Sequence, residues 1–115
     1  MERRIAFFGD YFDTFYKKQN AKIRIKIDYV LDVVKYIERV PIKFLKHLEG
    51  TDGVYEIRVS TTLKQIRIFC FFEEDKVIIL TNSFVKKTQK TPKKELDLAI
   101  KLKKEYYRLK TKGEL

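Results

Sequence analysis

Two arginines are the residues of this sequence best suited to chemistry on a phosphate. Arg58 and Arg67 lie in two apolar stretches that flank a short polar segment at 60–64. If that segment closes a hairpin symmetrically, Arg58 lies directly opposite Arg67. Like charges opposed across a sheet cost about 0.2–1 kcal/mol, whereas paired guanidinium groups bind phosphate oxygens in a bidentate manner. The pair therefore predicts an anion site.

A lysine cluster follows the next apolar run, between Ser83 and Glu95. Its members are Lys86, Lys87, Lys90, Lys93 and Lys94. A cluster held between two ordered elements presents its charges in one geometry, so the expected target is a phosphate backbone. A second hairpin, closed by the acidic turn 73–76, would bring Asn82 near Arg67 and carry the lysines to the same end of the sheet.

These cations suit cleavage of RNA without a metal, because RNA supplies its own nucleophile in the 2′-hydroxyl. Arg58 and Arg67 would stabilise the charge of the phosphorane. Lys86 and Lys87 are candidates for proton transfer, and Glu56 is the acidic residue predicted on the same face. The alternative interpretation is that Arg58 forms a weak ion pair with Glu56 or Glu73 on a solvated face.

Hydrophobic periodicity predicts the elements that position these side chains, starting with a buried strand over 5–8 and a short helix over 11–18. A longer helix should begin at the N-cap Asn20 and end before Pro41. Its apolar stripe is Ile23, Ile27, Val30, Leu31, Val34 and Ile37. The spacing of Phe44, Leu45 and Leu48 suits a helical turn before Gly50.

The second half of the sequence indicates three strands in an antiparallel meander, over 54–59, 65–72 and 77–81, with an extension of the last to residue 84 as the alternative. A basic helix follows, with Thr91 as N-cap and Pro92 at its first position. The fold class is therefore α+β, and the length fits one domain over 1–115.

Charge and composition narrow the function. The chain has 115 residues, 26 Lys+Arg against 16 Asp+Glu and a formal net charge of +10. Nucleic acid is the first expected partner, followed by an acidic protein or an anionic membrane surface; a basic surface without a polyanionic partner is the plain alternative.

Several classes of site and location are disfavoured. The lone Cys70 excludes a disulfide within the chain and fits a reducing cytoplasm. The lone His47 offers no transition-metal site, and no cofactor motif occurs, so we expect no cofactor. No apolar run reaches the roughly 20 residues that span a bilayer, and the apolar run near the start is too short for a signal peptide, so no membrane partner is expected.

Three segments, 48–58, 67–69 and 84–92, resemble the RelE/HigB toxins of bacterial type II toxin–antitoxin systems, and most of all the phage-derived HigB branch. The resemblance implies a strand, a helical hairpin, a three-stranded meander and a C-terminal helix. It implies metal-independent cleavage of messenger RNA in the ribosomal A site, leaving a 2′,3′-cyclic phosphate and a 5′-hydroxyl. The implied partners are ribosome-bound messenger RNA, ribosomal RNA and an antitoxin, often a helix-turn-helix protein.

The resemblance assigns function to Arg58, Arg67, Lys86 and Lys87, the residues that the pattern itself selects. Lys90, Lys93 and Lys94 would add phosphate contacts, and Phe84 is either a core residue or a platform for a base. The chain departs from the best-known pattern by having Glu56 where RelE proteins place a lysine. It also has Thr88, Gln89, Lys90 and Lys93 where some members have a tyrosine or histidine, which leaves the general base open.

Three other functions remain open at this point. One is a ParE-like inhibitor of DNA gyrase without nuclease activity, against which the arginine pair and the lysine loop both argue. The second is a non-catalytic nucleic-acid-binding module. The third is a degenerate toxin that binds only an antitoxin.

Overall fold

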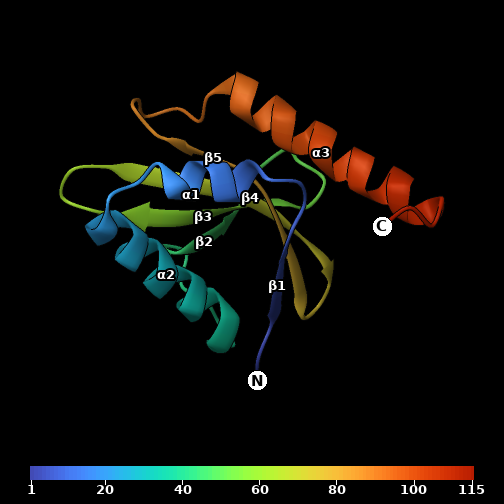
Figure 1. The fold of residues 1–115 in the computed structure, drawn as a ribbon, viewed down its shortest axis with the longest axis horizontal. Coiled ribbons are helices and arrows are strands. Elements are labelled where there is room, and N and C mark those ends of the chain that lie inside the picture. The colour runs from blue at the N-terminus through green and yellow to red at the C-terminus, as the bar shows by residue number, and fades with distance from the viewer.

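Three long antiparallel strands form the centre of the protein (Figure 1). The structure is a computed structural model that describes residues 1–115. In chain order the elements are β1 (Arg4–Phe7), α1 (Tyr11–Lys17), α2 (Ala21–Tyr36), β2 (Leu45–His47), β3 (Val54–Ser60), β4 (Gln65–Glu74), β5 (Val77–Val85) and α3 (Lys93–Thr111). The predicted α+β class is confirmed.

The five strands make one sheet in the order β1-β5-β4-β3-β2. The meander β3-β4-β5 is antiparallel, as its short connections predict. The first strand pairs in parallel with β5, and β2 pairs with the outer side of β3. Strand β4 therefore lies at the centre, which explains why it is apolar at nearly every position.

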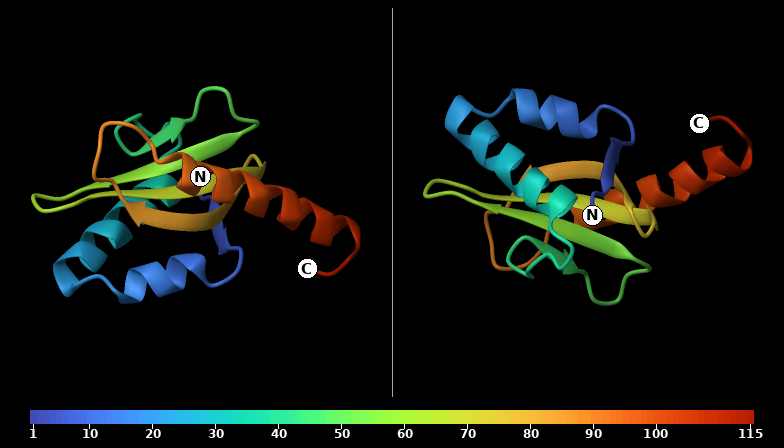
Figure 2. Two further views of the ribbon diagram at one scale, coloured as in Figure 1. Left: turned by 90° about the horizontal axis from the view of Figure 1, so that it is seen from above. Right: turned by 90° about the horizontal axis from the view of Figure 1, so that it is seen from below.

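Helices cover both faces of the sheet (Figure 2). On one face, side chains of α1 and α2 and of the sheet form a core of 12 buried residues, in which Ile57, Ile66 and Ile68 come from the central strands. On the other face, α3 covers two smaller clusters, one around Phe69 and one around Phe71. The two helical layers come from opposite ends of the chain, and the central strands lie between them.

The helix α2 forms where its periodicity predicts. The side chain of Asn20 caps it by accepting a hydrogen bond of 3.0 Å from the backbone N–H of Ile23. The stripe residues Ile23, Ile27, Val30 and Val34 are buried. Ile37 is exposed, because the helix ends at Tyr36 and Ile37 is its extended C-cap. The prediction that Ile37 belongs to the buried stripe is therefore wrong.

The predicted helical turn before Gly50 is also wrong. Residues Leu45–His47 form the edge strand β2, in which Leu45 lies opposite Ile57. Phe44 extends this pairing, because its carbonyl accepts a hydrogen bond of 2.8 Å from the N–H of Arg58. Pairing with β3 decides the conformation here, and apolar spacing over so few residues does not reveal it.

The start of α3 differs by one residue from the prediction. Pro92 is the N-cap instead of the first helical residue, and Thr91 makes no capping bond. The carbonyl of Pro92 accepts from the N–H groups of Glu95 and Leu96, both at 3.1 Å. Proline fits this position because it has no N–H to leave unpaired.

Candidate nucleic-acid interface

The two arginines face each other near the turn of the first hairpin. Strands β3 and β4 pair in the predicted register, with Arg58 opposite Arg67 and Glu56 opposite Phe69. The turn closes symmetrically because Thr61 bonds Lys64 twice: its N–H donates to the Lys64 carbonyl and its Oγ1 accepts from the Lys64 N–H. The like-charged pair is therefore a real feature of the sheet.

A buried carboxylate lies between these like charges. Glu56 is 2% exposed, and its Oε1 accepts a hydrogen bond of 3.0 Å from Arg58 Nε. The same Oε1 lies 3.9 Å from Arg67 Nε. The expected Arg58–Glu56 pair thus forms, but in the interior rather than on a solvated face. The carboxylate offsets one of the two positive charges, which makes the opposed arginines tolerable.

Arg67 is the most enclosed cation of the site, at 8% exposed. Its Nη1 donates a hydrogen bond of 3.0 Å to the carbonyl of Ile66. Burial lowers the pKa of Arg67, the Glu56 carboxylate acts in the opposite direction, and Arg58 adds to the lowering. A guanidinium nevertheless stays protonated at neutral pH. Arg67 Nε and Glu56 Oε2 have no hydrogen-bond partner, so part of this cluster is unsatisfied.

Arg67 opens into a shallow hollow with the lysine loop. The hollow has a volume of about 390 Å³ and is lined by Gln65, Arg67, Lys86, Lys87, Thr88 and Gln89. The backbone N–H of Lys86 continues the sheet pairing past β5 by donating to the carbonyl of Gln65 at 2.6 Å. Arg58 is not in its wall; it lies beside Arg67 and is joined to it through Glu56. The predicted convergence therefore applies directly to Arg67, Lys86 and Lys87.

Gln65 is a wall residue that sequence reasoning did not select. It lies two residues before Arg67 on the same strand, so the alternation of a strand places both side chains on one face. The two-residue spacing between Gln65 and Arg67 in the sequence could therefore have identified Gln65 as a neighbour of the site. Its side-chain Oε1 also accepts a hydrogen bond of 2.7 Å from the hydroxyl of Ser60.

Asn82 is not near Arg67 in the way the second hairpin predicts. The turn of this hairpin is at Asp75 and Lys76, with Glu74 opposite Val77, and Phe84 lies opposite Arg67. The side-chain amide of Asn82 instead donates to Glu95 of α3, to the carbonyl at 3.0 Å and to Oε1 at 3.1 Å. The prediction centred the turn on 73–76, one residue too early, and a turn displaced by one residue changes every pairing along the two strands.

The remaining predicted contacts separate into exposed and buried residues. Lys90 and Lys94 are exposed and form no ion pair, while Lys93 is exposed and paired with Asp97 at 2.8 Å. Phe84 is 7% exposed and packs on Phe69 with ring centroids 5.3 Å apart. Its ring is part of a core cluster under α3, which agrees with the core interpretation of Phe84 rather than with base stacking.

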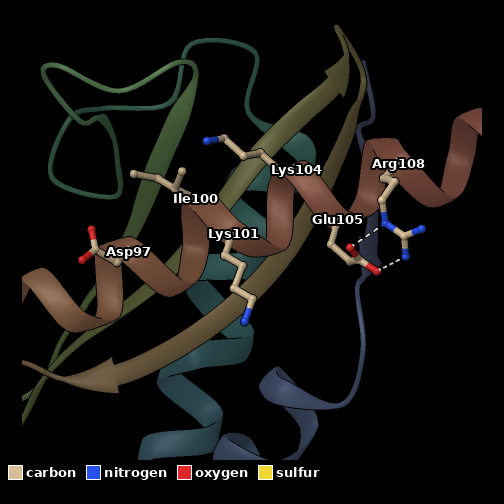
Figure 3. Close-up of a pocket in the computed structure, with 6 residues that line it drawn as sticks. All are labelled: Asp97, Ile100, Lys101, Lys104, Glu105 and Arg108. Carbon is tan, nitrogen blue, oxygen red and sulfur yellow. Dashed lines mark hydrogen bonds and ion pairs between the residues drawn. The ribbon is translucent and has the colours of Figure 1, made fainter.

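The outer side of α3 extends the positive surface (Figure 3). Lys101 and Lys104 point outward without an ion pair, whereas Arg108 donates to Glu105 at 2.9 Å through Nε. Lys94 precedes them on the same helix, next to the lysine loop. Unpaired cations therefore continue from the hollow along the helix.

No group of three or more His, Cys, Asp or Glu side chains is arranged to hold a metal ion. None of the three helices combines the length and apolar character that crossing a bilayer needs.

Comparison with known proteins gives one family match. The model of the family described as "Phage derived protein Gp49-like" matches residues 10–104. No curated protein matches the sequence.

Solved structures share the fold at low sequence identity. A chain of the archaeal RelE–RelB complex from Pyrococcus horikoshii OT3 superposes with a TM-score of 0.54 at 20% identity, covering 74% of this chain and 96% of that chain. A chain of the RelB–RelE antitoxin–toxin complex from Methanococcus jannaschii gives 0.52 at 20% identity, covering 70% and 88%. The RelE-like fold is confirmed.

Proposed function

The chain belongs to the Gp49-like family of phage-derived proteins, and we propose that it is the toxin of a type II toxin–antitoxin system. The expected resemblance to the RelE/HigB toxins agrees with this family and with the fold. We propose further that the toxin is a ribosome-dependent endoribonuclease that cleaves messenger RNA without a metal ion.

The hollow between Arg67 and the lysine loop is the observation that carries the proposal. Arg67 is fixed by the Ile66 carbonyl and by burial, and Lys86 is tied to the end of the sheet. Cations held in place before the substrate arrives stabilise developing negative charge without reorganisation. A protein that only binds another protein has no need of such a clamp, which favours a nuclease over a gyrase inhibitor.

In the proposed reaction, the 2′-hydroxyl of RNA attacks the adjacent phosphorus in line with the leaving 5′-oxygen. The hydroxyl loses its proton to a base, and the leaving oxygen takes one from an acid, which yields a 2′,3′-cyclic phosphate and a 5′-hydroxyl. Arg67 stabilises the phosphorane, and Arg58 supports it from the neighbouring strand. Lys86 and Lys87 line the hollow and are the proposed proton-transfer groups.

We assign Glu56 a positioning role. One of its oxygens is already engaged with Arg58, and the carboxylate is almost fully buried. A carboxylate in that position orients both guanidinium groups, and it has little access to a substrate hydroxyl.

The proposed partners follow from charge. Ribosomal RNA would contact the lysine loop with Lys90, Lys93 and Lys94, and the outer side of α3 beyond it. The antitoxin would be a protein encoded beside the toxin, since the structural neighbours are toxins in RelE–RelB complexes. We propose the helix-turn-helix type for it, as the resemblance to the RelE/HigB toxins implies. The site of action would be the cytoplasm, where ribosomes are.

Primer extension on a reporter messenger RNA in a reconstituted translation reaction tests this function. The protein is treated with EDTA first, and magnesium is then restored for the ribosome. We expect cuts that appear only with ribosomes, that map to the A-site codon and that disappear with Arg67→Ala. The matched control is Lys22→Gln, an exposed cation on α2, which should cleave as the unmodified protein does. Undisturbed translation without cleavage would contradict the proposal, and a DNA supercoiling assay would then test gyrase inhibition.

A further inference from the structure

A second pocket lies between the loop before β3 and the middle of α3. Its volume of about 480 Å³ falls within the range of about 300–1,000 Å³ that is typical of small-molecule sites. Val54, Ile100 and Tyr107 form the apolar part of its wall. Asp52, Lys103 and Lys104 add one negative and two positive groups. We call it the loop–helix pocket; an apolar wall with a few charged groups is the usual composition of a ligand site.

The loop is held in place without a ligand. The hydroxyl of Thr51 donates a hydrogen bond of 2.6 Å to the carbonyl of Leu48, which closes the loop on itself. Lys103 of α3 donates to the backbone carbonyl of Asp52 and so ties the loop to the helix. A Cβ at Gly53 would lie 3.1 Å from Lys103 Nζ, so this close approach favours glycine. The pocket is therefore preformed, and a ligand does not have to order it.

The aromatic ring in the wall is fixed as well. The ring of Tyr107 packs on Phe71 with centroids 5.7 Å apart and meets Tyr106 edge to face at 5.4 Å. Tyr107 is only partly buried, so the rest of its side chain is available to the pocket. A ring that is already held by its neighbours is a suitable platform for stacking of a planar group.

Free positive charge borders the apolar part of the pocket. Lys104 is exposed and forms no ion pair. Together with Ile100 it also lines a second, more polar hollow on the outer side of α3, to which Lys101 and Arg108 contribute. Figure 3 shows Ile100 and Lys104 directed to the same side of the helix and Lys101 to another. Lys104 therefore lies at the boundary between an apolar pocket and a positive surface.

We propose that the loop–helix pocket binds a single nucleotide. The base lies against Tyr107 and Ile100, and the phosphate pairs with Lys104. A nucleotide consists of a planar, largely apolar ring and an anionic group, which are the two parts that this pocket accommodates. The nucleotide is either free in solution or an unstacked residue of an RNA chain, since both offer the same chemistry.

The carboxylate of Asp52 argues against other anionic ligands. It forms no ion pair within the protein. A carboxylate repels an acidic peptide side chain, but it accepts hydrogen bonds from the N–H groups on the edge of a base. Guanine presents two adjacent N–H donors, which match the two oxygens of one carboxylate. Inorganic phosphate alone would leave Val54, Ile100 and Tyr107 without a contact.

The loop–helix pocket is separate from the proposed cleavage site. It shares no residue with the hollow between Arg67 and the lysine loop. Val54 is the first residue of β3, and Arg58, which pairs with Arg67, lies four residues further along the strand. Four residues of a strand span about 13 Å. The inference therefore goes beyond the proposed function and stands whether or not the chain cleaves RNA.

A nuclear magnetic resonance titration of the full chain with guanosine 5′-monophosphate tests the proposal. Ribose 5-phosphate, which has the phosphate but no base, is the matched control ligand. We expect the nucleotide to shift the resonances of residues 50–54 and 100–107. It should bind at least about tenfold more tightly than ribose 5-phosphate, because stacking of the base adds to the phosphate contact.

A short single-stranded RNA that contains guanine distinguishes the two sources of the nucleotide. If the RNA displaces guanosine 5′-monophosphate from residues 50–54 and 100–107, the pocket takes an unstacked residue of an RNA chain. If the RNA does not displace the bound nucleotide, the pocket takes a free nucleotide. Both results support a nucleotide site.

Matched variants test each part of the pocket. Lys104→Gln should weaken binding of guanosine 5′-monophosphate about fivefold, because a charged hydrogen bond to the phosphate is lost. Lys112→Gln removes the same charge about 12 Å further along the helix and should not weaken it. Tyr107→Leu should weaken binding about tenfold, whereas Tyr107→Phe, which keeps the ring, should not. Circular dichroism melting checks that each variant folds.

Three results would overturn the proposal. The first is equal affinity for guanosine 5′-monophosphate and ribose 5-phosphate, which would mean that the apolar wall takes no part. The second is a set of shifts centred on the lysine loop. The third is tighter binding of a glutamate-rich peptide than of the nucleotide at the same residues.

Discussion

The two faces of the central strands differ in the residues that they bury. The face under α1 and α2 buries the largest apolar cluster, in which Ile57, Val59, Ile66 and Ile68 are all 0% exposed. The face under α3 buries Glu56 and Arg67 on the same strands, and Asn82 of β5 is buried against α3. Neighbouring residues of one strand, such as Arg67 and Ile68, therefore serve opposite purposes.

This difference separates stability from chemistry. A buried charge is costly unless it is paired, and here the pairing is incomplete, because Arg67 Nε and Glu56 Oε2 lack partners. The apolar face must supply stability that the charged face does not. Single substitutions on each face of the same strands test this separation of stability from chemistry.

Arg67→Ala should have the largest effect, and on activity alone. Removal of the fixed guanidinium should lower cleavage about 100-fold or more, because the phosphorane charge loses its nearest donor. The measurement is the rate of A-site cleavage by primer extension. Folding should be nearly unaffected, since Glu56 keeps its bond to Arg58. A folded Arg67→Ala protein that cleaves at the original rate would refute the phosphate clamp.

Ile68→Ala, one residue further along β4, should have the opposite profile. It should lower the free energy of unfolding by about 2–5 kcal/mol, because it leaves a cavity in the core under α2. Urea unfolding followed by circular dichroism measures this loss. The protein that remains folded should cleave normally; a selective loss of cleavage at full stability would contradict the division between the two faces.

Glu56→Gln should affect both properties moderately. The amide keeps the shape but removes the negative charge between Arg58 and Arg67, so the free energy of unfolding should fall by about 1–3 kcal/mol. Cleavage should fall as the arginines lose their orientation, yet remain above that of Arg67→Ala. Combined urea unfolding and primer extension measure the two losses. A variant more active than the unmodified protein would show that Glu56 restrains the site instead of positioning it.

Tyr106→Phe should have the smallest effect, and it depends on pH. Tyr106 packs on Phe71 and its hydroxyl donates a hydrogen bond to Glu73, which joins α3 to the end of β4. Burial, and then the bond to Glu73, raise the pKa of Tyr106 to about 12. The bond from Tyr106 is the main cause that lowers the pKa of Glu73.

The sign of the pH effect follows from these shifts. The raised pKa of Tyr106 contributes stability that is complete below its usual value of 10.0 and is lost as pH rises toward about 12. The substitution should cost about 1 kcal/mol near neutral pH and flatten the decline of stability in that alkaline window. Thermal melts across pH measure both. An unchanged alkaline decline would mean that the bond does not stabilise the fold.

The arginine register was predictable because the first hairpin is local. The turn at 61–64 closes symmetrically, so the separation of Arg58 and Arg67 in the sequence determines their pairing. The burial of Glu56 was not predictable in the same way. Glu56 lies on the face of the sheet that α3 covers, beside Arg58 and Arg67, and this environment combines segments that are distant in the sequence.

The errors share one physical origin. Strand β2 forms because β3 offers it a free edge, and Asn82 lies away from Arg67 because the second hairpin turns one residue later than predicted. Neither a distant partner nor a displaced turn leaves a periodic trace in the sequence. The elements with long, regular patterns, α2 and the central strands, were predicted closely.

The outermost strands are much shorter than those they border. Strand β1 has four residues and β2 has three, against seven, ten and nine in β3, β4 and β5. An exposed strand edge is a template on which further chains can assemble into fibrils, and brief edges deny it the length to do so. We expect the protein to resist edge-to-edge aggregation even when it accumulates without a partner.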